Sequence, residues 1–282
     1  MRADLHCHST ASDGSCPPAE VMARARAAGL DVIALTDHDT VSGHGEARQA
    51  LPRGLTLVPG IELSCRLHGH SVHLLGYLFD PADAELAAEC ARIREHRSAR
   101  ARAMVARLAE LGAPVTWEQV SSIAGGGVVG RPHVARALVA AGVVGSLDEA
   151  FGPDWIGAGG RAQVHRYAPD PVLAIGLIRA AGGVAVLAHP RAAARGWLMP
   201  DEEITRLAAA GLAGIEVAHP AHDHAERIHL STLAAKLGLV ASGGSDDHGA
   251  STGYRIGCDT IARQAYERLV TQATGAAPVS GR

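Results

Sequence analysis

The feature that most constrains the fold is an alternation of short apolar runs with amphipathic segments along most of the 282 residues. Seven runs have the length and composition of β-strands, namely RADLH, DVIALTDHD, LTLVPGIEL, SVHLLGYL, GGVAVLAHP, LAGIEVAHP and LGLVASGGSDDH. Helix-like stretches such as 17–29, 201–211 and 223–237 separate several of them. This alternation predicts a mainly parallel α/β architecture. Periodicity alone leaves open whether the sheet is doubly wound or closed into a barrel.

The middle of the chain breaks this pattern. Residues 83–111 form one long stretch rich in Ala, Arg and Glu, and a second helical segment, RPHVARALVAAG, precedes the glycine-rich GPDWIGAGGR. We therefore expect a helical cap over 80–175, inserted between the two parts of one barrel or sheet, 1–79 and 176–282. The tail TQATGAAPVSGR is small and polar, so we expect it to fray.

Residues that can bind metals follow nearly every strand-like run. They are His6, His8, Asp37, His38, Asp39, Glu62, His189, Asp246 and His248, with His73 inside the fourth run. The carboxyl ends of strands share one rim in barrels and open α/β sheets, and active sites form there. In a chain with 16 histidines, any one pair could be an ordinary surface or core pair. Their recurrence at successive strand ends predicts a metal site.

Composition excludes several classes of function. A formal charge of −3 provides no basic surface for long DNA, and an aromatic content of 3% offers few stacking platforms for single strands. No apolar run approaches the roughly 18 residues needed to span a membrane. The N-terminus has no apolar signal-peptide core, so we expect a cytoplasmic protein. A small nucleotide or a short RNA remains compatible with this composition.

The segments DLHCHSTASDG, ALTDHDTVSG, PGIELS, VHLLGY, VLAHP and GGSDDHG resemble the successive motifs of the PHP (polymerase and histidinol phosphatase) superfamily. GRPHVARALVAAG resembles the cap of small bacterial PHP phosphoesterases that act on nucleoside 3′,5′-bisphosphates or trim short RNA from the 5′ end. The resemblance implies a distorted seven-stranded, TIM-like (β/α) barrel with a helical cap insertion. It also implies two to three divalent metal ions, for which Mn, Fe and Zn are all compatible with imidazole and carboxylate ligands.

The same resemblance implies roles for individual residues. Metal ligands would be His6, His8, Asp13, His38, Glu62, His73, His189, Asp246 and His248. Glu62 would bridge two metals, while Asp4, Asp37 and Asp39 would orient imidazoles. The nucleophile would be a metal-bound hydroxide, attacking phosphorus in line.

The cap suggests how substrate is held. Arg131, His133 and Arg166 are the expected substrate-binding residues, since arginine suits bidentate phosphate recognition. Each arginine could instead be a solvated surface residue. Family members usually carry Tyr-Val-Pro where this chain has 163–165, Gln-Val-His. His222 would protonate the leaving group, although an ordinary surface position fits it equally well, and His219 is assigned a structural or solvated role.

We therefore expect an enzyme that hydrolyses a small phosphomonoester, the 3′-phosphate of a nucleoside 3′,5′-bisphosphate. One alternative is a phosphodiesterase or 5′–3′ exoribonuclease acting on short RNA at the same metal site. A further alternative is a metal-bound module without catalysis. The partner expected in each catalytic case is a small phosphorylated compound, with no membrane and no obligate protein partner.

Overall fold

The computed structural model describes residues 1–192 and 197–281, and its centre is a nearly closed, barrel-shaped sheet. Seven strands follow one another in chain order, and they are β1 Ala3–Asp4, β2 Val32–Leu35, β3 Thr56–Leu67, β4 His70–Tyr77, β5 Val184–Leu187, β6 Gly214–Ala218 and β7 Val240–Gly243. A parallel bridge between Cys7 and Asp247 brings the first strand beside the last. The seven expected strands and the barrel are confirmed.

The sheet is less parallel than the alternation predicted. Strands β1 to β3 are parallel, as are β5 to β7, but β4 runs antiparallel to both of its neighbours. The cause is a tight hairpin at His68 and Gly69, which both have positive φ, as a two-residue type I′ turn requires. Strand β3 therefore continues for 12 residues, and Glu62 lies in its middle instead of at its end.

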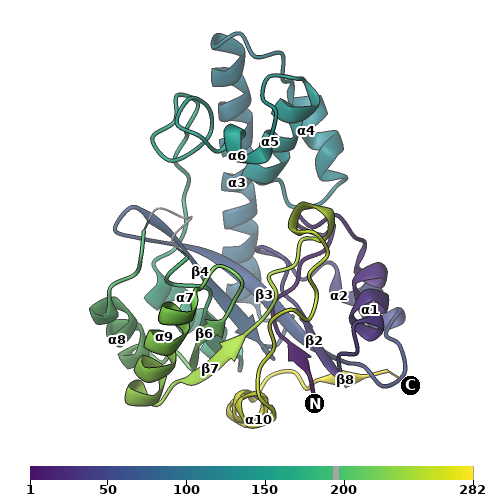
Figure 1. Ribbon diagram of the computed structural model, residues 1–282, viewed down its shortest axis with the longest axis vertical. Helices are drawn as coiled ribbons and strands as arrows, with labels where there is room; N and C mark the ends of the chain where they lie inside the picture. Colours follow the sequence, from purple (N-terminus) through teal and green to yellow (C-terminus); the bar gives the residue numbers. More distant parts are fainter. Residues whose placement is uncertain (193–196, 282) are drawn as a thin grey trace.

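Ten helices accompany the strands in the described part of the chain. They are α1 Pro18–Ala27, α2 His44–Gln49, α3 Ala84–Glu110, α4 Trp117–Ala124, α5 Arg131–Ala140, α6 Leu147–Ala150, α7 Pro171–Ala180, α8 Asp201–Ala209, α9 His224–Leu237 and α10 Arg263–Gln272. Figure 1 shows α4, α5 and α6 together with the far end of α3 at one end of the molecule, and the remaining helices around the barrel.

Helix α3 joins two apolar clusters. Leu86 and Ile93 near its start belong to the cluster around β3 and β4, whereas Met104 and Leu108 near its end belong to a cluster shared with α4 and α5. Its 27 residues span roughly 40 Å at 1.5 Å per residue. The helical segment above the barrel thus has an apolar core of its own. The expected boundaries at 80 and 175 stay a prediction.

The C-terminal tail differs from the prediction. Instead of fraying, it forms β8, Val279–Ser280, which pairs antiparallel with the start of β3. Backbone hydrogen bonds from Ala276 to Leu78 and from Gly281 to Leu55 hold the segment on either side.

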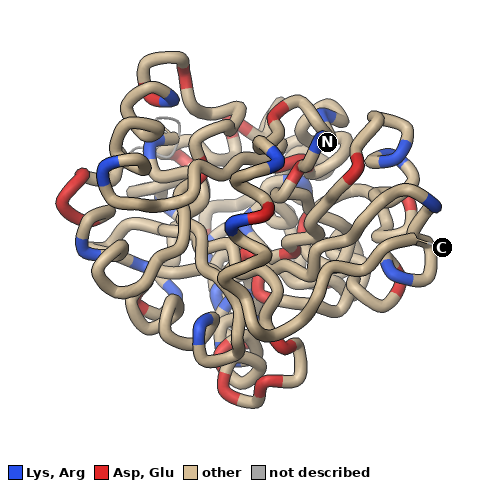
Figure 2. Tube along the Cα trace, turned by 90° about the horizontal axis from the view of Figure 1, so that it is seen from below, with Lys and Arg blue, Asp and Glu red and all other residues tan. Residues whose placement is uncertain are grey.

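Acidic and basic residues are mixed on the barrel face in Figure 2. Among the described helices, none is both long and apolar enough to cross a bilayer.

Candidate metal centre

The nine residues predicted as metal ligands converge at the carboxyl-end rim of the barrel, below the cap. Tight backbone geometry brings them there. At Gly244, after β7, a Cβ atom would clash with the backbone nitrogen of His6, so only glycine lets these two segments approach. His189 and Asp246 have φ values of 43° and 48°, a left-handed conformation that is uncommon outside glycine. Such strain is found preferentially at functional sites.

One group of four buried atoms lies on the inner side of the rim. The Nε2 atom of His8 is 3.2 Å from both Glu62 Oε2 and Asp246 Oδ1, and the Nε2 atom of His6 is 3.4 Å and 3.3 Å from the same two oxygens. Donors held 2.0–2.2 Å from a single ion are separated by roughly 2.8–3.6 Å in tetrahedral or octahedral geometry. The four atoms therefore have the spacing of ligands around one metal.

Glu62 faces imidazoles with both of its oxygens. Its Oε1 lies 2.6 Å from His73 Nδ1 and 3.0 Å from His189 Nε2. Its Oε2 faces His6 and His8, and lies 3.1 Å from His38 Nδ1. A carboxylate in this position can bridge two ions.

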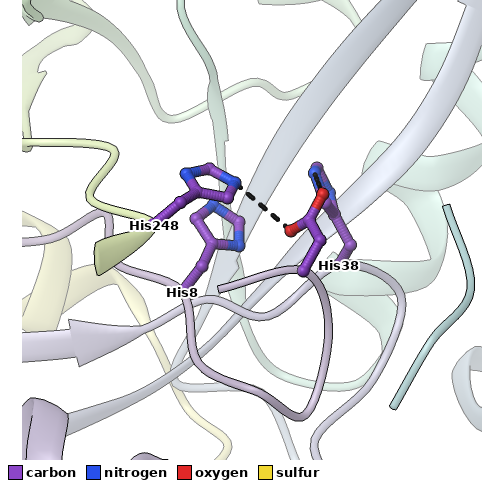
Figure 3. A group of neighbouring side chains, drawn as sticks. His8, His38 and His248 are labelled. Carbon is purple, nitrogen blue, oxygen red and sulfur yellow. Dashed lines mark ion pairs between the residues drawn. The ribbon is translucent and has the colours of Figure 1, made fainter. Parts of the chain in front are cut away.

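Another group of candidate ligands lies beside the first and consists of His8, Asp13, His38 and His248. Asp13 lies 3.2 Å from His248 Nε2 and 3.8 Å from His38 Nε2. Figure 3 shows the rings of His8, His38 and His248 gathered around one carboxylate, and the rings of His8 and His248 are stacked with centroids 4.0 Å apart.

The unused nitrogen atoms of this cluster fit a metal. His6 Nε2, both ring nitrogens of His8 and His38 Nδ1 are buried and form no hydrogen bond with the described residues. Buried polar atoms without partners are costly and rare in folded proteins. Neutral imidazole nitrogens and carboxylates are the ligands that zinc, iron and manganese accept, so the residues present match the group that the sequence predicts.

Electrostatics of the cluster favour a cation. Burial alone would raise the pKa of Glu62, yet the imidazoles of His38 and His73 hold that pKa well below its usual value. Burial likewise opposes a charge on His8, but the adjacent carboxylates of Asp246 and Glu62 raise the His8 pKa to about 10. The carboxylates thus attract positive charge to this point of the structure.

The three aspartates expected to orient imidazoles form no hydrogen bond with an imidazole ring in the described part of the chain. Asp4 accepts hydrogen bonds from the backbone of His6, Ser245 and Gly257. Asp37 accepts from Ser9 and Ser12, and Asp39 from Ser64 and Arg97. These carboxylates therefore fix the loops that carry the candidate ligands, and that expectation was wrong in its detail.

Two residues that the sequence reading missed take the orienting role instead. The Nδ1 atom of His6 lies 3.0 Å from Glu216 Oε1, which leaves His6 Nε2 free to face the cluster. The backbone N–H of Ala221 donates to His219 Nδ1, so His219 Nε2 carries the proton and donates to Asp246 Oδ2 at 3.3 Å. Glu216 lies inside β6 and His219 directly follows it, so the position at the strand end could have identified His219.

A cavity of about 580 Å³ opens above this cluster. Its walls include seven of the nine candidate ligands together with four arginines, Arg97, Arg100, Arg131 and Arg166. Arg131 and Arg166 were predicted to bind substrate, and the cavity wall contains both. Arg97 and Arg100 were missed, because both belong to α3, whose periodicity indicates a helix but not which arginines face the barrel.

Nearby carboxylates neutralise only part of the positive charge of these four arginines. Arg97 is buried and pairs with Asp39 at 2.5 Å. Burial, together with the charges of Arg166 and Arg97, lowers the pKa of Arg100 to about 8, and burial beside Arg97 lowers that of Arg166 to about 10. The buried Nε of Arg100 has no hydrogen-bond partner among the described residues. Such a group is suited to an anion entering from the cavity.

Two other predicted residues lie apart from the described cavity walls. His133 is buried, and its Nδ1 accepts a hydrogen bond from the backbone N–H of Gly130 at the start of α5. His222 is buried too, with Nδ1 3.2 Å from the Val217 carbonyl and its ring 5.4 Å from that of His219. The substrate role of His133 and the acid role of His222 stay predictions.

Comparison with known proteins agrees with this geometry. The model of the PHP domain matches residues 4–114. A 5′-3′ exoribonuclease of Haemophilus influenzae is 36% identical, covering 87% of this chain and 89% of the relative. A 3′,5′-nucleoside bisphosphate phosphatase of Chromobacterium violaceum is 37% identical, covering 89% of each. A crystal structure of a candidate metal-dependent phosphoesterase from Bifidobacterium adolescentis superimposes with a TM-score of 0.90, at 33% identity and 96% coverage of both chains.

Proposed function

We propose a substrate and a division of labour for this chain, which belongs to the PHP family and is a metal-dependent phosphoesterase. The substrate is a nucleoside 3′,5′-bisphosphate, and the bond hydrolysed is that of the 3′-phosphate. The observation that carries the proposal is one cavity in which a cluster of candidate metal ligands and a group of four arginines share the wall. Two separate cationic regions suit a compound with two phosphates.

The candidate ligands would hold two to three divalent ions, Mn, Fe or Zn. His6, His8, Glu62 and Asp246 form one group, Glu62 with His73 and His189 a second, and Asp13, His38 and His248 a third. When bound, such ions neutralise phosphoryl oxygens and lower the pKa of bound water toward neutrality.

The chain's own residues position the substrate. Arg131 and Arg166 hold the phosphate that does not react, and this contact fixes the reacting phosphate over the histidine cluster. Glu216 and His219 keep His6 and Asp246 in the orientation seen in the structure. His222 is the candidate for protonating the departing oxygen, and this role requires the doubly protonated ring, because Nδ1 donates to the Val217 carbonyl and burial lowers the pKa of His222.

A second candidate function is 5′–3′ exoribonuclease activity on short RNA. The relative from Haemophilus influenzae supports it, as its name states this activity. The same arginines would then hold the 5′-phosphate of the RNA, and the next phosphodiester would take the place of the 3′-phosphate. We place the phosphatase first because the cap helices lie over the barrel rim and the cavity is of mononucleotide size.

The proposal is tested by comparing two substrates of the Mn²⁺-loaded protein. A charge-assisted contact to phosphate contributes roughly 1.5–3 kcal/mol, or about 10- to 150-fold. Arg131→Ala and Arg166→Ala should lower kcat/KM by that factor for adenosine 3′,5′-bisphosphate and change it little for adenosine 3′-monophosphate, which lacks the second phosphate. Arg161→Ala, an exposed cap arginine outside the described cavity wall, is the matched control. Equal losses on both substrates would contradict a role in holding the second phosphate.

A further inference from the structure

We infer that the mouth of the cavity is a binding site for the nucleobase, gripped between Trp197 on the barrel side and Phe151 on the cap side. The inference rests on the proposed function and extends it, because it assigns the third part of the substrate. The inference also predicts substrate selectivity, because compounds with two phosphates and no planar ring should be poor substrates.

The two walls of the cavity come from different parts of the chain. On the barrel side are His70 and Val72 of β4, with Trp197 and Met199 after β5. On the cap side are Phe151 and Pro153, which follow α6, with the small residues Gly157 and Ala158. The candidate metal ligands and the arginines line the same cavity. A ligand held at its phosphates would therefore extend its remaining part between two largely apolar walls.

The aromatic side chains at this cavity are notable because the chain has few. The sequence contains 3 Trp, 4 Tyr and 2 Phe, and one Trp and one Phe line this single cavity. Phe151 is 36% exposed, and Trp197 is half-buried. Trp197 packs in part against the barrel core, and this contact gives its side chain a structural role. That packing does not explain why an exposed phenyl ring lines the same cavity.

The orientation of Trp197 is fixed. Its ring stacks on that of His70 at the hairpin end of β4, with centroids 4.5 Å apart and planes only 7° from parallel. The guanidinium of Arg131 lies 5.7 Å from the Phe151 ring centroid. Phe151 therefore lies beside an arginine proposed to hold phosphate. A base stacked on Phe151 would be close enough to that phosphate for both to belong to one nucleotide.

The chemistry of the walls selects a flat, weakly polar group. Aromatic side chains stack on any base, because every base has a π-face. A sugar phosphate without a base would leave both rings in contact with water. The cavity volume of about 580 Å³ falls within the usual range for small-ligand sites.

The test compares adenosine 3′,5′-bisphosphate with its abasic analogue, 1,2-dideoxyribose 3,5-bisphosphate. Stacking on one aromatic side chain corresponds to about 5- to 150-fold in affinity. The wild-type protein should prefer the nucleoside compound in kcat/KM by at least the lower figure. Trp197→Ala and Phe151→Ala should each reduce that preference, Trp197→Phe should retain most of it, and none should alter turnover of the abasic analogue by more than about twofold. Trp117→Ala, a half-buried tryptophan outside the described cavity wall, is the control.

A second readout needs no metal. In chelator-treated protein, adenosine 5′-monophosphate should quench tryptophan fluorescence, and the quenching should disappear in Trp197→Phe but persist in Trp117→Phe. Equal wild-type turnover of the nucleoside and abasic compounds would overturn the base site and leave the proposed phosphatase intact. Failure to hydrolyse either bisphosphate would count against the proposed function itself, while quenching that depends on Trp197 would still support the base site.

Discussion

At the scale of single residues, Glu62 has the greatest influence on the metal centre, because its two oxygens face different sets of imidazoles. His73 and His189 lie at Oε1, whereas His6 and His8 lie at Oε2. Its pKa is held well below the usual value despite burial, so the carboxylate is charged at neutral pH. The proposed bridge therefore depends on a charge that no neutral side chain of similar shape can supply.

Replacing Glu62 by Gln should lower kcat for the bisphosphate at least about 100-fold, because one substitution removes charge from two proposed metal positions. Elemental analysis should find two to three ions per chain in the wild-type protein and fewer in the variant. Glu46→Gln, at an exposed position of α2, should change neither quantity. Near-normal turnover of Glu62→Gln would exclude it from the metal cluster.

His219 offers a second test, because its Nε2 lies 3.3 Å from Asp246 Oδ2 and we expect it to hold this carboxylate in place. His219→Ala removes the N–H that reaches Asp246 Oδ2, and partners of this kind typically contribute 10- to 100-fold in metal affinity. We expect Mn²⁺ affinity, measured from the signal of free Mn²⁺ in electron paramagnetic resonance, to fall by about that factor. His219→Gln, which keeps an N–H donor, should recover part of the loss.

The matched control for His219 is His229→Ala. His229 is exposed and pairs with Asp201 on the outer surface, so its loss should leave Mn²⁺ affinity unchanged. Unaltered affinity in His219→Ala would show that the contact with Asp246 is incidental.

Eight of the nine candidate ligands could be predicted from the sequence because each follows or lies in a strand whose composition was clear, whereas Asp13, in the loop after β1, was expected from the family resemblance alone. His219 and Glu216 were not found, although Glu216 lies inside β6 and His219 directly follows it. A histidine in the sequence HPAHDH gives no local sign of its direction. The folded structure places its Nε2 3.3 Å from Asp246 Oδ2, and the hydrogen bond from Ala221 determines its tautomer.

At the scale of elements, α3 determines which arginines reach the cavity. The helix packs on the barrel with its first half and on the cap with its second, and Arg97 and Arg100 fall near the change between the two. Arg97 is compensated by Asp39, whereas Arg100 is half-buried, and the charges of Arg166 and Arg97 act on it. The charge of Arg100 therefore adds little to the stability of α3.

Arg100→Gln should therefore separate stability from function. Removing a half-buried charge that lies among like charges should leave Tm unchanged or raise it, because the depressed pKa of Arg100 reports a charged form that burial and its neighbours disfavour. The kcat/KM for adenosine 3′,5′-bisphosphate should fall about 10-fold or more. Glu95→Gln, at an exposed position of the same helix, should affect neither. A fall of several degrees in Tm would show that Arg100 is structural.

The hairpin of β3 and β4 marks what the pattern of strands could not predict. Both strands were found, but alternating apolar runs do not encode their direction. The turn at His68 and Gly69 reverses the chain without a helix between the strands, which makes β4 antiparallel and places Glu62 in the middle of β3. The short β8 was missed for a similar reason, because its pairing with β3 is non-local and its residues are small.

At the scale of the whole molecule, the barrel supplies the candidate metal ligands and the helical segment above it supplies arginines and one aromatic wall. The strands and the clustering of candidate ligands at their ends could be predicted from recurring local patterns, whereas the barrel was expected from the family resemblance. The cavity could not be predicted from local patterns, because its walls combine α3, the segments before α7, the start of β4 and the loop after β5. Its selectivity is a property of this assembly and of no single motif.

The most direct test of the account measures the products that the Mn²⁺-loaded wild-type protein forms from adenosine 3′,5′-bisphosphate and from the 5′-phosphorylated dinucleotide pApA. The account predicts inorganic phosphate and adenosine 5′-monophosphate from the bisphosphate, with a higher kcat/KM than for the dinucleotide. Rapid cleavage of the dinucleotide with no phosphate released from the bisphosphate would contradict it and favour the exoribonuclease.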